Sequence, residues 1–209
     1  MSNQEEQLSA LNDIRKMMDR SSRFISLSGL SGVFAGITAL GGAYFADREL
    51  RAYANRDLET AYFDMSAEFN LIKIAILVLI IALLGGMLFT YRQSKKKNLP
   101  IWDKTAKNLL INLAIPLIAG GLFIIALLMV HSNAYGLIAP SCLVFYGLAL
   151  VNASKYTYSD IRFLGICEII LGLIAMFYIG YGLYFWAIGF GILHILYGLV
   201  MYFKYERAK

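Results

Sequence analysis

The sequence predicts an all-α membrane protein: a polytopic bundle of six transmembrane helices, built of three helical hairpins, with the N- and C-termini cytoplasmic. Three observations predict this fold class. The chain is rich in apolar residues, these residues gather into six runs long enough to cross a bilayer, and the basic residues concentrate in alternate connecting segments.

The composition excludes most soluble classes. Of the 209 residues, 59% are hydrophobic and 16% are charged, whereas soluble domains carry about 25% charged residues. A soluble domain of this length has too little interior to bury so much apolar surface. The composition therefore argues against a soluble enzyme, a disulfide scaffold and a disordered chain.

Six apolar runs come close to the roughly 20 residues that a helix needs to cross the hydrocarbon core. They lack the in-and-out alternation that barrel strands show over about ten residues, so we expect helices. Together the runs form a membrane domain over 24–204, with spans at 24–45, 71–91, 109–130, 137–153, 163–179 and 183–203. The first run is longer than the apolar part of a signal peptide and follows 23 polar residues, so it should stay as a span.

The distribution of lysine and arginine predicts the orientation. Fifteen of these residues fall in the N-terminal tail, the second and fourth connecting segments and the C-terminus, against three (Arg48, Arg51 and Arg56) in the first segment. The positive-inside rule then places both termini in the cytoplasm of a cell membrane, which we take to be a bacterial inner membrane. The fifteen are Arg15, Lys16, Arg20, Arg23, Arg92, Lys95, Lys96, Lys97, Lys104, Lys107, Lys155, Arg162, Lys204, Arg207 and Lys209.

This asymmetry also bears on partners. The net charge of +5 is concentrated on the predicted cytoplasmic side, where basic residues are attracted to anionic lipids of the inner leaflet. We therefore expect the lipid bilayer and its anionic lipids as partners, and no nucleic acid.

Two polar segments flank the first span. Residues 1–23 are expected to form a cytoplasmic amphipathic helix, because Leu8, Leu11, Ile14 and Met18 recur at helical spacing. It would lie on the inner leaflet, or residues 2–20 would dock a cytoplasmic protein or a second copy in a homo-oligomer. Residues 46–70 form the longest outer segment, and their composition without Gly or Pro favours a helical loop that extends the first two spans.

Spans 3–4 and 5–6 look like tandem copies offset by 51 residues, with eight identities over 38 aligned positions. An even number of spans in each copy would give both copies the same orientation, related by an axis along the membrane normal. The segments 165–172 and 191–198, with spaced glycines among aliphatic residues, resemble the hairpin repeats of the HdeD-like acid-resistance membrane proteins. The resemblance covers mainly residues 109–203. It implies six helices in three hairpins, and neither a function nor catalytic residues follow from it. The long outer segment 46–70 and the polar N-terminus depart from that pattern.

The first span carries two rows of small residues at four-residue steps. One row is Ser28, Gly32 and Gly36, and the other is Ser31, Ala35 and Ala39. Small residues let helix backbones approach closely in lipid. We expect the rows to pack within the chain, with a homodimer seam as the alternative.

Motifs for catalysis, metals and cofactors are absent from the sequence. We find no GxSxG, HExxH or P-loop motif, and Cys142 and Cys167 lie inside spans without the spacing of a zinc site. We therefore predict no catalytic residue, no metal site and no cofactor.

Glu168 and His194 are the candidate intramembrane polar pair. Each lies thirteen residues from Tyr181, the centre of the turn between spans 5 and 6, so both should reach the same depth, roughly 20 Å from that turn. An unpaired carboxylate there costs at least about 2–3 kcal/mol, so Glu168 should be protonated or partnered. His194 is the nearest candidate by depth, and the others are Asn112, Ser141, Tyr146 and Tyr197. Depth does not fix which way the side chains face.

These observations favour a non-enzymatic integral membrane protein with a structural, regulatory or stress-related role. The Glu168–His194 pair would then be a hydrogen-bonded lock between helices or a proton-responsive site. The alternative is a small-solute or proton-coupled transporter or channel that uses Glu168 and His194, and a membrane-embedded enzyme ranks third.

Overall fold

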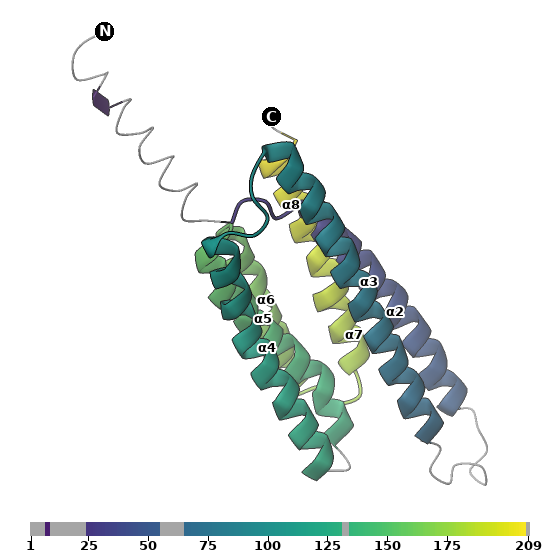
Figure 1. The fold of residues 1–209 in the computed structure, drawn as a ribbon. Helices are drawn as coiled ribbons and strands as arrows, with labels where there is room; N and C mark the ends of the chain where they lie inside the picture. The colour runs from purple at the N-terminus through teal and green to yellow at the C-terminus, as the bar shows by residue number, and fades with distance from the viewer. Residues whose placement is uncertain (1–6, 9–23, 55–64, 131–133, 208–209) are drawn as a thin grey trace.

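The computed structural model describes residues 7–8, 24–54, 65–130 and 134–207, and within these ranges all regular structure is helical (Figure 1). The predicted amphipathic helix at 1–23 lies outside the described residues except for Gln7 and Leu8, which are helical. The described part of the chain therefore agrees with the predicted all-α class and contains no strand.

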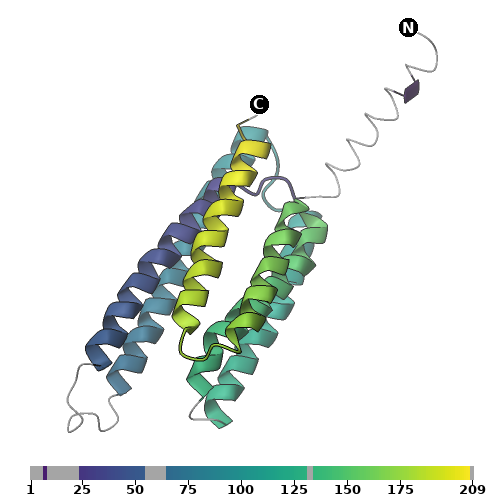
Figure 2. The same cartoon turned by 180° about the vertical axis from the view of Figure 1, so that it is seen from behind.

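The long helices run between the same two ends of the molecule (Figures 1 and 2). Gly182–Tyr205 is one continuous rod, in which a π-helical stretch, η3, separates α7 from α8. The elements are α2 (Gly29–Ala54), α3 (Met65–Lys97), α4 (Lys104–Val130), η1 (Ala134–Leu137), α5 (Ile138–Ala153), η2 (Ser154–Tyr156), α6 (Asp160–Ala175), α7 (Gly182–Trp186), η3 (Ala187–Leu193) and α8 (His194–Tyr205).

Five helical segments are long and apolar enough to cross a membrane. They are Gly29–Tyr53, Phe69–Lys97, Lys104–Val130, Ala134–Tyr156 and Gly182–Tyr205. The predicted fifth span, 163–179, corresponds to α6, which has 16 residues and is shorter than each of these five segments. At 1.5 Å per residue, α6 covers about 24 Å, somewhat less than a hydrocarbon core of about 30 Å.

The helices form two groups of three. In the first, which we call the α2 unit, α2 lies between α3 and the α7–η3–α8 rod; in the second, the α5 unit, α5 lies between α4 and α6. Figure 2 shows the two units side by side. The predicted third hairpin is therefore not a closely packed pair, because α6 packs on α5 while α8 packs on α2.

Glycines explain these two pairings. A Cβ atom built at Gly32 of α2 would lie 3.2 Å from Cα of Gly198 on α8, and one at Gly165 of α6 would lie 2.7 Å from the carbonyl oxygen of Gly147 on α5. Backbones this close leave no room for larger residues. Each unit thus contains a glycine-lined contact between two helices. In the α2 unit these helices, α2 and α8, are distant in sequence, and in the α5 unit they are the consecutive helices α5 and α6.

The outermost helix of each unit is exposed. In α3 and in α4, only 6% of the most apolar 18-residue window is buried, and their exposed residues are mainly Leu, Ile, Phe and Met. An apolar surface of this size would be costly in water. The exposure is what a lipid-facing helix requires.

The first helix begins later than predicted. Residues 24–28 are not helical, and α2 starts at Gly29. Their backbone bonds to other elements instead: Phe24 N–H donates to the carbonyl oxygen of Tyr156 at 2.7 Å, and the Thr157 hydroxyl donates to the carbonyl oxygen of Phe24 at 2.8 Å. At the other end, α2 continues to Ala54 and α3 begins at Met65, so both helices enter the predicted outer loop 46–70 from its two sides.

We call residues 24–29 and the side chains that hold them the latch. Lys97 Nζ and the Tyr158 hydroxyl each donate to the carbonyl oxygen of Ile25 at 2.8 Å. The Glu206 carboxylate accepts from the backbone N–H of Gly29, where it satisfies an otherwise free donor at the start of α2. The latch therefore ties the ends of α2, α3 and α8 to the linker between α5 and α6.

Candidate functional site

Glu168 lies on the buried face of α6. Ile161, Leu164, Glu168, Gly172 and Ala175 are buried and recur at steps of three or four residues, which places them on one side of the helix. The Glu168 side chain is completely buried, with 0% exposure. The sequence thus sets an ionisable group in the middle of a face that is otherwise apolar.

His194 reaches Glu168 from the other unit. It is the first residue of α8, is 7% exposed, and its Nδ1 atom lies 3.5 Å from Oε1 of Glu168. The structure therefore brings together the two residues that the sequence placed at equal depth. Because α6 belongs to the α5 unit and α8 to the α2 unit, the contact crosses the boundary between the units.

Two hydrogen bonds fix the imidazole ring. Its Nδ1 atom is 2.9 Å from the carbonyl oxygen of Gly189, and its Nε2 atom is 2.7 Å from the Tyr146 hydroxyl. A carbonyl oxygen can only accept, so Nδ1 carries a hydrogen. In the neutral ring Nε2 then accepts from Tyr146, whereas in the charged ring Nε2 donates to it.

The carboxyl group of Glu168 is not satisfied in the same way. Neither of its oxygens has a hydrogen-bond partner among the described residues. The 3.5 Å separation from Nδ1 suits an ion pair but exceeds hydrogen-bond length, because the Nδ1 hydrogen points to Gly189. A buried carboxylate without a counterion or hydrogen bonds is strongly unfavourable, so Glu168 must keep its proton or face a charged His194.

The π-helical stretch shapes the site. In η3 the helix is wider than an α-helix, a feature that occurs often at functional sites. Gly189 lies in this stretch, and a Cβ atom there would meet Leu143 and Oε2 of Glu168. Glycine at 189 therefore leaves room for the carboxyl group, while its carbonyl oxygen orients the imidazole.

Aromatic rings cover one side of the pair. Phe190 stacks on His194 with ring centroids 5.9 Å apart, and Tyr146 lies 5.0 Å from Phe190 and 5.3 Å from His194. These rings exclude polar neighbours from that side of the imidazole. Ser141 on α5 is also buried, and its hydroxyl has no partner among the described residues.

The other predicted partners lie elsewhere. Asn112 accepts a hydrogen bond at its carbonyl oxygen from the Asn152 side chain at 2.9 Å, and the Tyr197 hydroxyl lies 3.9 Å from Sγ of Cys167. Of the four alternatives to His194, Tyr146 joins the cluster, but through His194 rather than through Glu168. Gly189 was not identified from the sequence. The usable signal is a glycine on one helix at about the same depth as an acid on another.

The predicted packing rows lie within the molecule. Gly32 faces α8 and Gly36 faces η3, since Cβ atoms there would meet the backbone at Gly198 and Gly191, respectively, and the Ser28 hydroxyl donates to Glu206 at 3.2 Å. In the second row, Ala39 is buried, while Ser31 and Ala35 are half-buried and Ser31 donates to the carbonyl oxygen of Ser28.

Glu168 and His194 are the two groups of this cluster that can exchange a proton near neutral pH. Within the described ranges, no group of three or more His, Cys, Asp and Glu side chains is placed to hold a metal ion. Cys142 and Cys167 are free thiols on α5 and α6. What the cluster can do is hold one proton on either Glu168 or His194.

Comparison with protein-family models, with curated proteins and with solved structures finds no match for this chain. The resemblance to the HdeD-like proteins therefore stays a prediction, and the function has to be argued from the geometry of the chain itself.

Proposed function

We propose that this chain is a non-enzymatic integral membrane protein with a regulatory role, in which the Glu168–His194 pair controls how the two three-helix units hold together. It spans a bacterial inner membrane six times, and both termini lie in the cytoplasm. The short helix α6 is the fifth span in chain order and adds to the five long apolar helices. The five long apolar helices and the fifteen-to-three distribution of basic residues support this topology.

The observation that carries the proposal is the 3.5 Å contact across the unit boundary, made by a carboxyl group with no hydrogen-bond partner. Two arrangements satisfy it: a neutral acid beside a neutral imidazole, or a carboxylate beside an imidazolium. Both contain the same number of protons. Gain or loss of one proton leaves a single buried charge without a counterion, which weakens the contact.

The other titratable residues on the helices around the pair decide whether a further group could balance its charge. On α5 the titratable residues are Cys142 and Tyr146. Besides the pair itself, α6 carries Asp160, Arg162 and Cys167, and α8 carries Tyr197, Tyr202, Lys204 and Tyr205. The α2 helix, which packs on η3 and α8, has no titratable residue from Gly29 to Ala43. The charged residues of α6 and α8 other than the pair are Asp160, Arg162 and Lys204, and they lie six to ten residues from Glu168 or His194 along the helices, so none of them substitutes for either member.

A double-mutant cycle tests the proposal. Glu168→Gln, His194→Gln and the double variant are compared with the parent by thermal unfolding in detergent between pH 5 and pH 8. We expect a coupling energy of about 1–3 kcal/mol between the two residues. The thermal stability of the parent should change with pH in this range, and that of the double variant should not. Tyr197→Phe is the control, because it removes a polar group one helical turn from His194 without touching the pair. Additive losses with no pH dependence contradict the regulatory role.

A second function, a proton-coupled transporter or channel using Glu168 and His194, is favoured by one observation. A carboxyl group without fixed donors, next to a π-helical turn, is suited to release and rebind a proton. The test is proton uptake into proteoliposomes monitored with a pH-sensitive dye. Flux above the lipid leak that Glu168→Gln abolishes supports transport, and leak-level flux in the parent favours the regulatory role.

The topology has its own test. In the predicted outer loop, Asn55→Cys should react with an impermeant thiol reagent applied to intact cells, and Lys96→Cys should react only after lysis. Both variants are made in a background in which Cys142 and Cys167 are replaced by alanine. The reverse pattern rules out the cytoplasmic placement of the termini. The proposed partners of residues 2–20, an anionic lipid surface, a cytoplasmic protein or a second copy, can be tested by deleting that segment.

A further inference from the structure

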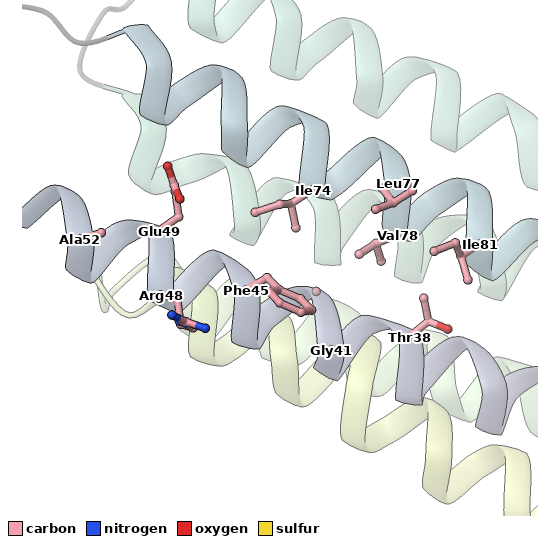
Figure 3. A pocket seen from close by; sticks show the side chains of 11 residues that line it. Thr38, Gly41, Phe45, Arg48, Glu49, Ala52, Ile74, Leu77, Val78 and Ile81 are labelled. Carbon is pink, nitrogen blue, oxygen red and sulfur yellow. The ribbon is translucent and has the colours of Figure 1, made fainter.

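A groove of about 600 Å³ runs along the seam between α2 and α3 (Figure 3). Its α2 side is formed by residues at steps of three and four, and its α3 side by four aliphatic residues. The lining residues are Thr38, Gly41, Gly42, Phe45, Arg48, Glu49, Ala52, Ile74, Leu77, Val78 and Ile81.

Small residues create the groove. A Cβ atom at Gly41 would meet nothing within 4 Å, so the space beside α2 is open there. A Cβ atom at Gly42 would instead meet the side chain of Val78, which closes the bottom of the groove. Most of the lining is therefore apolar, as binding sites for lipophilic ligands usually are.

One end of the groove is charged. Arg48 forms no ion pair with any described residue, whereas Arg51, one turn further along α2, is bound to Asp47 at 2.7 Å. Glu49 accepts a hydrogen bond from the Asn70 side chain at 2.7 Å, which orients its carboxylate toward α3. Figure 3 shows both side chains at the same end of the groove, with Glu49 on the side of α2 that faces α3 and Arg48 on the opposite side of α2.

The depth of this charged end follows from helix geometry. Arg48 is nineteen residues from Gly29, or about 28 Å along α2, which nearly equals the hydrocarbon thickness of about 30 Å. With the start of α2 at one boundary of the hydrocarbon, Arg48 lies at the other, at the level of lipid phosphates. Thr38 lies about 15 Å deeper, near the middle of the bilayer.

We propose that this groove binds one phospholipid of the leaflet at the Arg48 end, with an acyl chain between α2 and α3 and an ethanolamine headgroup at the rim. The Arg48 guanidinium binds the phosphate, for which its planar donors are suited. The Glu49 carboxylate accepts hydrogen bonds from the primary ammonium group. The inference needs only that α2 and α3 are inserted in a membrane, not the regulatory role of Glu168 and His194.

The headgroup choice follows from the pair of opposite charges. A choline headgroup has no N–H to donate to Glu49, and a glycerol headgroup has no positive charge to offset the carboxylate. A second protein is less suited to the site, because the groove ends at the phosphate level and continues into the hydrocarbon.

The test measures which lipids stay bound to the full-length protein. The purified chain is equilibrated with mixed micelles containing equal amounts of phosphatidylethanolamine, phosphatidylcholine and phosphatidylglycerol, and bound lipids are counted by native mass spectrometry. We expect phosphatidylethanolamine to predominate. Arg48→Gln should lower its retention about tenfold, while Arg51→Gln, the matched charge control on the same helix, should leave it unchanged.

Two further variants distinguish recognition of the lipid headgroup from binding of the acyl chain in the groove. Glu49→Gln keeps an acceptor for Asn70 but removes the charge, so it should abolish the preference for ethanolamine over choline. Gly41→Leu fills the open space and should lower retention of all three lipids, whereas Gly86→Leu on α3, where a Cβ atom also meets nothing within 4 Å, should not. Unchanged thermal midpoints show that the variants remain folded.

Equal losses in Arg48→Gln and Arg51→Gln, or equal retention of the three lipids by the parent, would mean non-specific boundary lipid and overturn the proposal. Glu168→Gln should retain phosphatidylethanolamine like the parent, so failure of the regulatory role leaves this result unaffected.

Discussion

The latch and the Glu168–His194 cluster are both buried polar networks that join the α2 unit to the α5 unit, but they differ in how completely their groups are paired. In the latch, backbone carbonyls of residues 24 and 25 accept from Thr157, Tyr158 and Lys97. In the cluster, both oxygens of Glu168 lack a partner among the described residues. A network whose polar groups are paired and a network with unpaired polar groups thus lie on the same boundary between the two units.

The difference indicates that the two networks have different roles. A fully paired network rigidifies the structure it belongs to, whereas a partly paired one is sensitive to a single proton. Burial raises the pKa of Tyr158 in the latch to about 12, so this donor stays protonated throughout the physiological range. We therefore expect the latch to be a fixed attachment and the cluster to be the part of the boundary that responds to conditions.

The largest effect should come from breaking the cluster on one side. His194→Leu leaves Glu168 with no basic neighbour, and removing one member of a buried pair costs about 3–5 kcal/mol. The free energy of unfolding, measured with a chemical denaturant in detergent, should fall by that amount. Replacing both residues with leucine should recover most of the loss, and a double variant no more stable than His194→Leu would contradict the pairing.

An intermediate effect is expected in the latch. Lys97→Met removes the charged donor to the Ile25 carbonyl and to the Tyr158 hydroxyl, which should lower the free energy of unfolding by about 1.5–3 kcal/mol. The neighbouring Lys96→Met serves as the control and should stay within about 0.5 kcal/mol of the parent. A loss larger than that of His194→Leu would reverse the comparison between the two networks.

A smaller effect should follow from removing one neutral hydrogen bond to the cluster. Tyr146→Phe deletes the hydroxyl next to Nε2 of His194, at a cost of about 0.5–1.5 kcal/mol. Thermal unfolding of this variant should also depend on pH differently from that of the parent, because the imidazole loses its partner. Tyr197→Phe, whose hydroxyl lies 3.9 Å from Cys167 Sγ, should change neither quantity by as much.

The sequence predicted the helical class and the depth of the central pair, because both follow from hydrophobic runs and from counting residues along a helix. It did not predict which way Glu168 faces. Facing depends on the pairing of α6 with α5, which is set by close contact between Gly165 and Gly147. The hairpin prediction assumed that a short turn brings its two helices together, whereas α8 packs instead on the glycines of α2.

The remaining misses concern backbone that departs from regular α-helix. Residues 24–28 were predicted to begin the first span because they continue its apolar run. Their backbone groups instead form hydrogen bonds with the α5–α6 linker, and no local sequence pattern indicates a partner so distant in the chain. The π-helical stretch that places Gly189 beside Glu168 was likewise not predicted from the sequence. Local sequence sets the elements, and contacts distant in sequence set how they meet.

The smallest effect concerns Asp160, which lies beside the latch at the start of α6. Its carboxylate accepts from Lys204 Nζ at 3.0 Å and from the Tyr205 hydroxyl at 2.5 Å. Partial burial raises the pKa of Asp160, but these hydrogen bonds outweigh it and hold the pKa below its ordinary value. A carboxyl whose pKa is lower in the folded state stabilises the fold above its unfolded pKa of about 3.9, and that stability is lost as the pH falls through the lower, folded value.

Asp160→Asn should therefore lower the thermal midpoint at pH 7 by only about 1–2 °C, because the Lys204 side chain of the pair is half exposed to solvent. Below about pH 4 the parent should lose this advantage, and the two curves should converge. The measurement is the thermal midpoint of both proteins from pH 2.5 to pH 7 in the same detergent. An advantage that persists at the acid end would mean that Asp160 acts through packing, and one that disappears between pH 5 and pH 8 would assign to the latch the response that we assign to Glu168 and His194.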